Sequence, residues 1–105
     1  MELQADAKNR IETILGNNKV VLFMKGTANF PMCGFSARAV GILQDIGVDF
    51  HAVDVIQDAE IREAIKVYGN WPTIPQLYIN KQLVGGSDIM MEMYQNGELQ
   101  TQLKS

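Results

Sequence analysis

The sequence predicts an α/β domain in which a four-stranded mixed sheet is flanked by helices. Three observations support this fold class. A continuous run of apolar, β-forming residues at 20–24 is typical of a strand that is buried on both faces. Segments with apolar residues at helical spacing alternate with short strands in the first half of the chain. In the second half, two short strands follow each other directly and a helix comes after them.

The chain is predicted to begin with a helix, a buried strand and a loop. Apolar residues at helical spacing over 7–15 indicate the helix, and Gly16 is its expected end. The strand at 20–24 follows. The loop at 25–31 then contains a glycine and ends on a proline, so regular structure is not expected there.

A second helix and strand complete a βαβ unit. The helical pattern runs over 33–46, and Gly47 closes it. A second strand is expected over 50–55. Two strands joined through a helix in this way lie parallel in one sheet.

The third helix is predicted between a capping aspartate and a glycine. Asp58 can accept a hydrogen bond from the free N–H groups of the first turn, and Gly69 ends the helix. The segment 71–75 contains two prolines, which break regular structure twice.

Two short strands and a final helix complete the predicted fold. The strands span 76–79 and 82–84, and residues 80–81 join them as a hairpin turn. Ser87 or Asp88 is expected to cap the last helix through its side chain.

The predicted order of elements is α-β-α-β-α-β-β-α, and Gly97 separates the last helix from a short helical tail. A βαβ half followed by a ββα half is the thioredoxin-like arrangement. The length of 105 residues suits a single domain over 1–105.

Composition and charge make several classes of partner unexpected. The net charge is −3 and the pI is about 5.0, so neither nucleic acid nor an anionic membrane surface is an expected partner. No apolar run reaches the ~18 residues that a membrane span needs.

The first residues, Met1–Asp6, lack the basic start and apolar stretch of a secretory signal and the arginine bias of a transit peptide. The expected location is cytoplasmic, and a processed organellar form stays open as the alternative.

The single cysteine, Cys33, is the candidate reactive group. With one cysteine, neither an internal disulfide nor a multi-cysteine metal site can form within one chain. The predicted start of a helix at Cys33 would stabilise a thiolate there, and Lys25 at the end of the preceding strand could add positive charge. A buried, inert cysteine is the alternative.

Serine replaces the second thiol of a redox pair. The dithiol signature is Cys-x-x-Cys, whereas the stretch here is Cys33-Gly34-Phe35-Ser36. Because Ser36 has no sulfur, a cycle through an internal disulfide is excluded.

Four blocks of sequence resemble the monothiol glutaredoxins of the Cys-Gly-Phe-Ser type. Their order matches the family, and the similarity covers nearly the whole chain. The blocks are Lys25-Gly26-Thr27, Pro31-Met32-Cys33-Gly34-Phe35-Ser36, Asn70-Trp71-Pro72-Thr73-Ile74-Pro75-Gln76-Leu77-Tyr78 and Val84-Gly85-Gly86-Ser87-Asp88.

The resemblance implies roles for a thiol and two cations. Cys33 would ligate iron or form a mixed disulfide with glutathione. Lys25 and Arg62 would hold the glycine carboxylate of glutathione, a pairing that suits an anionic peptide. Without the resemblance, Arg62 is more simply a solvated residue on a helix face, and Lys25 an ordinary charge at a strand end.

The resemblance also implies two backbone contacts with glutathione. Ile74 would precede a cis proline and pair with the extended peptide as an added strand does. Ser87 and Asp88 would receive the γ-glutamyl end. A plain loop with a trans proline and a simple helix cap are the alternatives. Many relatives carry a second cysteine at position 87, so the serine here removes any disulfide through that position.

The resemblance implies a 2Fe–2S cluster shared by two chains. Such a cluster usually takes four thiolate ligands. Two chains would supply Cys33 twice, and two glutathione molecules would complete the set in a homodimer. The family also implies iron–sulfur acceptor proteins as partners, a role in iron homeostasis, and a BolA-like protein that can replace one protomer.

The alternative function is a glutathione-dependent thiol transferase. Cys33 would attack a glutathionylated protein, and a second glutathione would resolve the adduct. The loop at 27–31 resembles the longer loop of the cluster-binding type, and Met32 stands where many active relatives carry a polar residue. The sequence therefore predicts weak turnover at most.

Overall fold

The computed structural model describes residues 3–104. Residues 1–2, where the N-terminal stretch used to predict location begins, and residue 105 lie outside this range. The described elements, in chain order, are α1 (Ala5–Asn17), β1 (Val20–Met24), α2 (Gly34–Ile46), β2 (His51–Asp54), α3 (Ala59–Tyr68), β3 (Gln76–Ile79), β4 (Gln82–Gly85), α4 (Ser87–Asn96) and α5 (Glu98–Lys104).

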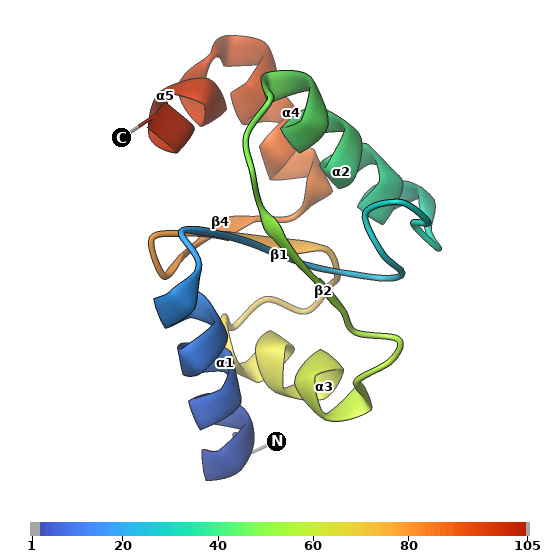
Figure 1. The fold of residues 1–105 in the computed structure, drawn as a ribbon, viewed down its shortest axis with the longest axis vertical. Coiled ribbons are helices and arrows are strands. Elements are labelled where there is room, and N and C mark those ends of the chain that lie inside the picture. The colour runs from blue at the N-terminus through green and yellow to red at the C-terminus, as the bar shows by residue number, and fades with distance from the viewer. Residues whose placement is uncertain (1–2, 105) are drawn as a thin grey trace.

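The strands form one mixed sheet in the order β2-β1-β3-β4. β1 runs parallel to β2, and the β1–β3 and β3–β4 pairs are antiparallel. Helices α1 and α3 cover one face, while α2, α4 and α5 cover the other (Figure 1). This confirms the predicted thioredoxin-like fold. Across residues 3–104, none of the helices has the length and apolar character needed to cross a membrane.

Several element boundaries differ by one residue from the prediction: β4 extends through Gly85, α2 begins at Gly34 after Cys33 as its N-cap, and α1 and β2 also differ. Helix α1 continues past Gly16 to Asn17, because the side chain of Asn18 donates a hydrogen bond to the carbonyl of Ile14 (2.9 Å) and satisfies the helix end there. Strand β2 covers His51–Asp54 rather than 50–55, since its pairing with β1 extends over these four residues.

The predicted cap of α4 is wrong. Asp58 caps α3 as expected, accepting a hydrogen bond from the N–H of Ile61 (3.2 Å). At α4, however, Gly86 takes the N-cap position and Ser87 is the first helical residue, without a side-chain cap. The side chains of Ser87 and Asp88 are therefore placed inside the first turn, where they cannot bond back to it as a cap does.

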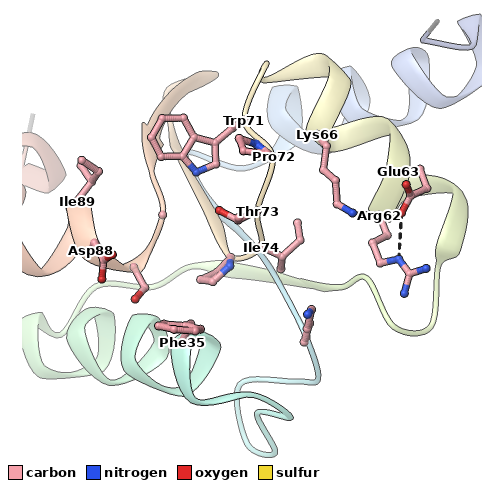
Figure 2. A pocket seen from close by; sticks show the side chains of 14 residues that line it. Phe35, Arg62, Glu63, Lys66, Trp71, Pro72, Thr73, Ile74, Asp88 and Ile89 are labelled. Atoms are coloured by element: carbon pink, nitrogen blue, oxygen red, sulfur yellow. Dashed lines mark hydrogen bonds and ion pairs between the residues drawn. The ribbon is translucent and has the colours of Figure 1, made fainter. Parts of the chain in front are cut away.

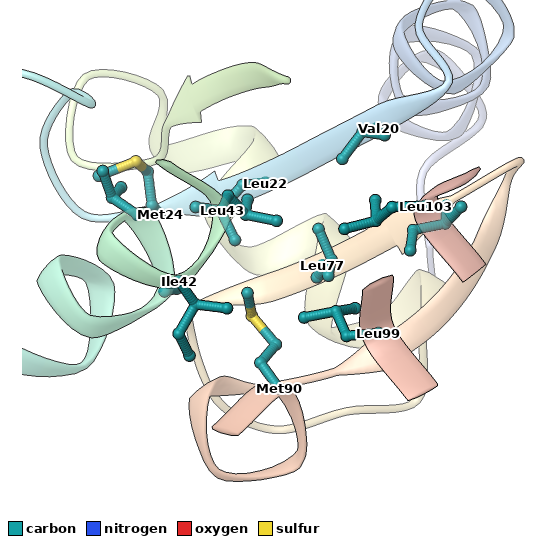
Figure 3. Packing of buried hydrophobic residues seen from close by; sticks show 12 residues of the cluster. Val20, Leu22, Met24, Ile42, Leu43, Leu77, Met90, Leu99 and Leu103 are labelled. Atoms are coloured by element: carbon teal, nitrogen blue, oxygen red, sulfur yellow. The ribbon is translucent and has the colours of Figure 1, made fainter. Parts of the chain in front are cut away.

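The core consists of two clusters, one on each face of the sheet. Strand β1 lies between them, with all five residues buried. Val20, Leu22 and Met24 pack against α2, α4 and α5 (Figure 3), and Val21 and Phe23 pack against α1 and α3. Burial on both faces explains the unbroken apolar run at 20–24.

Candidate functional site

A groove of about 530 Å³ opens where the end of β1, the segment 71–75 and the N-termini of α2 and α4 meet. Five of the six residues singled out from the sequence line it: Lys25, Arg62, Ile74, Ser87 and Asp88. Figure 2 shows Arg62 at one end of the groove, Asp88 at the other and Ile74 between them. Residues up to 63 positions apart in the chain are thus brought to one site.

The sixth residue, Cys33, lies beside the groove at the N-cap of α2. Its sulfur is half-buried, so the alternative of an inert core cysteine does not apply. The N–H of Ser36 donates to Sγ at 3.3 Å, and the hydroxyl oxygen of Ser36 lies 3.4 Å from Sγ. These contacts place two donors on a thiolate at the positive end of a helix.

Opposing effects set the acidity of Cys33. Burial of the sulfur is the largest single effect and opposes ionisation. The hydroxyl and N–H of Ser36 stabilise the thiolate, and the N–H of Phe35 and the charge of Lys25 add to them. Together they hold the pKa of Cys33 below its ordinary value.

Ser36 joins the thiol to the groove. Its side chain has no exposed surface, and its hydroxyl oxygen accepts a hydrogen bond from the N–H of Lys25 at 3.0 Å. That acceptor role leaves the hydroxyl proton free to point toward Sγ when the sulfur is ionised. Ser36 therefore fixes the end of β1, which carries Lys25, against the helix that carries Cys33.

One end of the groove is cationic and contains a residue that the sequence analysis missed. Arg62 and Lys66 both line this end, together with Glu63. Glu63 Oε2 lies 3.2 Å from Arg62 Nε and 3.3 Å from Lys66 Nζ. The signal for Lys66 was present in the sequence, because residues four positions apart share one face of a helix.

The middle of the groove is formed by the segment 71–75. The Ile74–Pro75 bond is cis, as the family resemblance implied. The side chain of Ile74 packs into the core, and within residues 3–104 neither its N–H nor its C=O forms a hydrogen bond. The buried side chain of Gln76 holds the segment by donating to the carbonyls of Trp71 (2.9 Å) and Thr73 (3.3 Å).

The other end of the groove is the start of α4. The Ser87 hydroxyl is buried and has no hydrogen-bond partner among the described residues. Asp88 is 89% exposed and lies 3.5 Å from Arg38 of α2. Gly86 allows the close approach of the two walls, since a Cβ there would lie 3.2 Å from the carbonyl oxygen of Pro75.

Exposed apolar side chains surround Cys33 in the chain. Phe30, Met32 and Phe35 are 78%, 67% and 58% exposed, and all lie within three residues of the cysteine. In the part of the chain that the structure describes, no cluster of three or more His, Cys, Asp or Glu side chains is placed to hold a metal ion. One chain therefore offers a single thiolate to a metal.

The chain is similar to known proteins along most of its length. The model of the glutaredoxin family matches residues 20–84. An uncharacterized monothiol glutaredoxin, ycf64-like, of Synechocystis sp. is 55% identical over 97% of this chain and 95% of its own length. This chain belongs to the monothiol glutaredoxins.

Solved structures agree with the fold of this monothiol glutaredoxin. The reduced apo form of poplar GrxS14 has a TM-score of 0.85 at 43% identity, over 99% of this chain and 95% of its own. Buckwheat glutaredoxin, solved as a complex with glutathione, has a TM-score of 0.84 at 22% identity, over 94% and 88%. At 22% identity, the likeness to buckwheat glutaredoxin shows only that the two proteins share a fold.

Proposed function

We propose that this monothiol glutaredoxin binds glutathione in the groove and, as a dimer, carries a 2Fe–2S cluster that it passes to acceptor proteins. The observation that carries the proposal is the position of one half-buried thiol of lowered pKa beside a groove with opposite charges at its two ends. A dithiol cycle is excluded because Ser36 has no sulfur.

The groove fits the chemistry of glutathione. Lys25, Arg62 and Lys66 suit the glycine carboxylate. The free N–H and C=O of Ile74 suit the extended cysteinyl backbone. At the start of α4, the helix N–H groups and the unpartnered Ser87 hydroxyl suit the γ-glutamyl carboxylate, and Asp88 suits its ammonium. The buckwheat glutaredoxin complex is consistent with this assignment.

In this proposal the cluster is cargo held by four thiolates. Cys33 from each of two chains and one glutathione thiol in each groove make up that number. The exposed apolar residues Phe30, Met32 and Phe35 suit an interface that excludes water around the sulfur. A BolA-like protein in place of one copy is part of the same proposal, because it would meet the same surface.

Anaerobic reconstitution tests the proposal. Apo protein mixed with iron, sulfide and glutathione should give a coloured dimer with two irons per two chains. Cys33→Ser should stay colourless and monomeric, whereas Lys8→Gln on α1, away from the groove, should still form the coloured dimer. A colourless monomer of the wild-type protein under these conditions would contradict the proposal.

A thiol transferase is the alternative that shares the same groove and thiol. Its step would be attack of the Cys33 thiolate on a mixed disulfide, with release of the target thiolate and transfer of glutathione to Cys33. Rapid glutathione-dependent turnover of a small mixed disulfide, without cluster formation, would favour it.

A further inference from the structure

Two cations of the groove share one internal counter-ion. Glu63 Oε2 lies 3.2 Å from Arg62 Nε and 3.3 Å from Lys66 Nζ. We propose that Glu63 is a specificity-determining residue: its carboxylate pairs with both Arg62 and Lys66 in the free protein, offsetting one of their two charges, and is displaced when the terminal carboxylate of a peptide ligand binds. This inference rests on the proposed function, because it takes glutathione as that ligand.

The three side chains lie together at one end of the groove. All three line it, and Figure 2 shows Arg62, Glu63 and Lys66 projecting from the same helix, α3. Their side chains are 45%, 46% and 33% exposed, respectively. They are therefore accessible to a ligand and are not locked into the core.

The exchange replaces one carboxylate by another. Glu63 contacts the guanidinium of Arg62 at Nε, and Arg62 has four further N–H donors that can meet an incoming carboxylate. Lys66 likewise keeps donors beyond the one it directs at Glu63. To pair with Arg62 and Lys66, the ligand carboxylate must therefore displace the carboxylate of Glu63.

This competition favours a ligand that is anchored elsewhere in the groove. A small carboxylate in solution gains two exposed ion pairs and loses translational freedom, so Glu63 suppresses its binding. A peptide whose backbone pairs with Ile74 and whose far end reaches Ser87 presents its carboxylate at a high effective concentration. Glu63 is thus expected to set both the selectivity and the release of glutathione.

The opposite end has a weaker version of the same arrangement. Asp88 lies 3.5 Å from Arg38, but its side chain is 89% exposed.

Glu60 on α3 pairs with Arg10 at 2.7 Å and does not line the groove. Glu60 therefore offers a matched control, because the same substitution removes one charge and one exposed ion pair from the same helix.

Calorimetric titration of the apo protein with reduced glutathione tests the inference. We expect Glu63→Gln to bind about two- to fivefold more tightly than wild type, the range of an exposed ion pair. Glu60→Gln should match wild type. Glutathione whose glycine carboxylate is converted to an amide should bind Glu63→Gln and wild type equally, because it brings no carboxylate to compete.

The other possible outcomes contradict either the inference about Glu63 or the proposed function. Unchanged or weaker binding by Glu63→Gln would overturn the inference, and so would an equal gain in Glu60→Gln or with the amide ligand. If the wild-type protein failed to bind glutathione, the proposed function would be contradicted and the inference would fall with it. If wild type bound and Glu63→Gln showed no gain, the inference alone would fail.

Discussion

The hydroxyl oxygen of Ser36 lies 3.4 Å from the sulfur of Cys33 and also accepts a hydrogen bond from the backbone of Lys25. A dithiol protein would carry its second sulfur at this position. Here a fully buried hydroxyl occupies it and contacts the thiol without being able to oxidise with it. The same residue that removes the dithiol cycle therefore stabilises the thiolate.

Removal of the Ser36 hydroxyl should raise the pKa of Cys33. In Ser36→Ala the thiolate loses its side-chain donor, so the alkylation rate of the apo protein near neutral pH should fall and its pH profile should move to higher pH. Iodoacetamide alkylation against pH measures this. Ser87→Ala, which removes a hydroxyl that does not contact the sulfur, should leave the profile unchanged.

The same shift has a consequence for stability. Because the folded-state pKa of Cys33 is lowered, ionisation contributes stability that is present above the unfolded pKa and is lost as the pH falls through the folded pKa. Ser36→Ala should reduce that dependence. An alkylation profile and a pH dependence of unfolding identical to those of wild type would show that Ser36 does not act on the thiol.

Gln76 should be required for the shape of the groove. Its side chain donates to the carbonyls of Trp71 and Thr73 and accepts from the hydroxyl of Tyr78 (3.1 Å). Gln76→Leu removes the partner of the buried Tyr78 hydroxyl and of the two part-buried carbonyls, so the free energy of unfolding should fall by about 1–3 kcal/mol and glutathione binding should weaken. Urea unfolding and calorimetry measure the two effects.

The matched variant Tyr78→Phe removes one of these hydrogen bonds and leaves the loop contacts intact. It should cost about 1 kcal/mol and leave glutathione affinity near wild type. If Tyr78→Phe weakened glutathione binding as much as Gln76→Leu does, the loop contacts of Gln76 would not be what shapes the groove.

Gly26 should not tolerate a side chain. Its φ is +92°, and an added Cβ would come within 2.7 Å of the N atom of Met32. Because backbone atoms cannot yield as a flexible side chain does, Gly26→Ala should destabilise the protein by about 1–3 kcal/mol and disturb the loop before Cys33. Thermal unfolding measures the change.

Gly41 provides the contrasting case. It lies within α2, and an added Cβ would meet no atom within 4 Å. Gly41→Ala should therefore stabilise the protein by about 0.5–1 kcal/mol through helix propensity. Equal effects of the two substitutions would contradict the role of the loop geometry at Gly26.

Lys66, which the sequence analysis did not single out, should contribute to ligand binding. In the proposed binding mode, Lys66→Gln removes a partly exposed contact to the glycine carboxylate, so glutathione affinity should fall by about two- to fivefold. Lys8→Gln on α1, away from the groove, should have no effect in the same calorimetric titration. An unchanged affinity of Lys66→Gln would remove this residue from the proposed site.

Element identity followed from local patterns. The apolar run of β1 matches its burial on both faces, and Asp58 and Gly69 mark the limits of α3 as predicted. The turn at Asn80–Lys81 has positive φ at both residues, which suits the predicted tight hairpin. These features depend on residue spacing and backbone preference, and neighbouring residues determine both.

Features that depend on distant contacts were less predictable. The N-cap of α4 is Gly86, which also lies against Pro75 of the other wall of the groove. Lys66 belongs to the site because α3 lies beside the segment 71–75 and both line the groove. The buried role of Gln76 likewise depends on the carbonyls that the loop turns toward it.

The sequence by itself determined the family, the order of the elements and the presence of one thiol without a partner thiol, because each is a matter of residue type and spacing along the chain. The tertiary structure alone decided that Ser36 contacts both Cys33 and Lys25, and that Arg62, Glu63 and Lys66 of α3 line the same groove as Asp88 of α4. Such contacts depend on distances of about 3 Å between side chains, and a one-dimensional pattern cannot specify these.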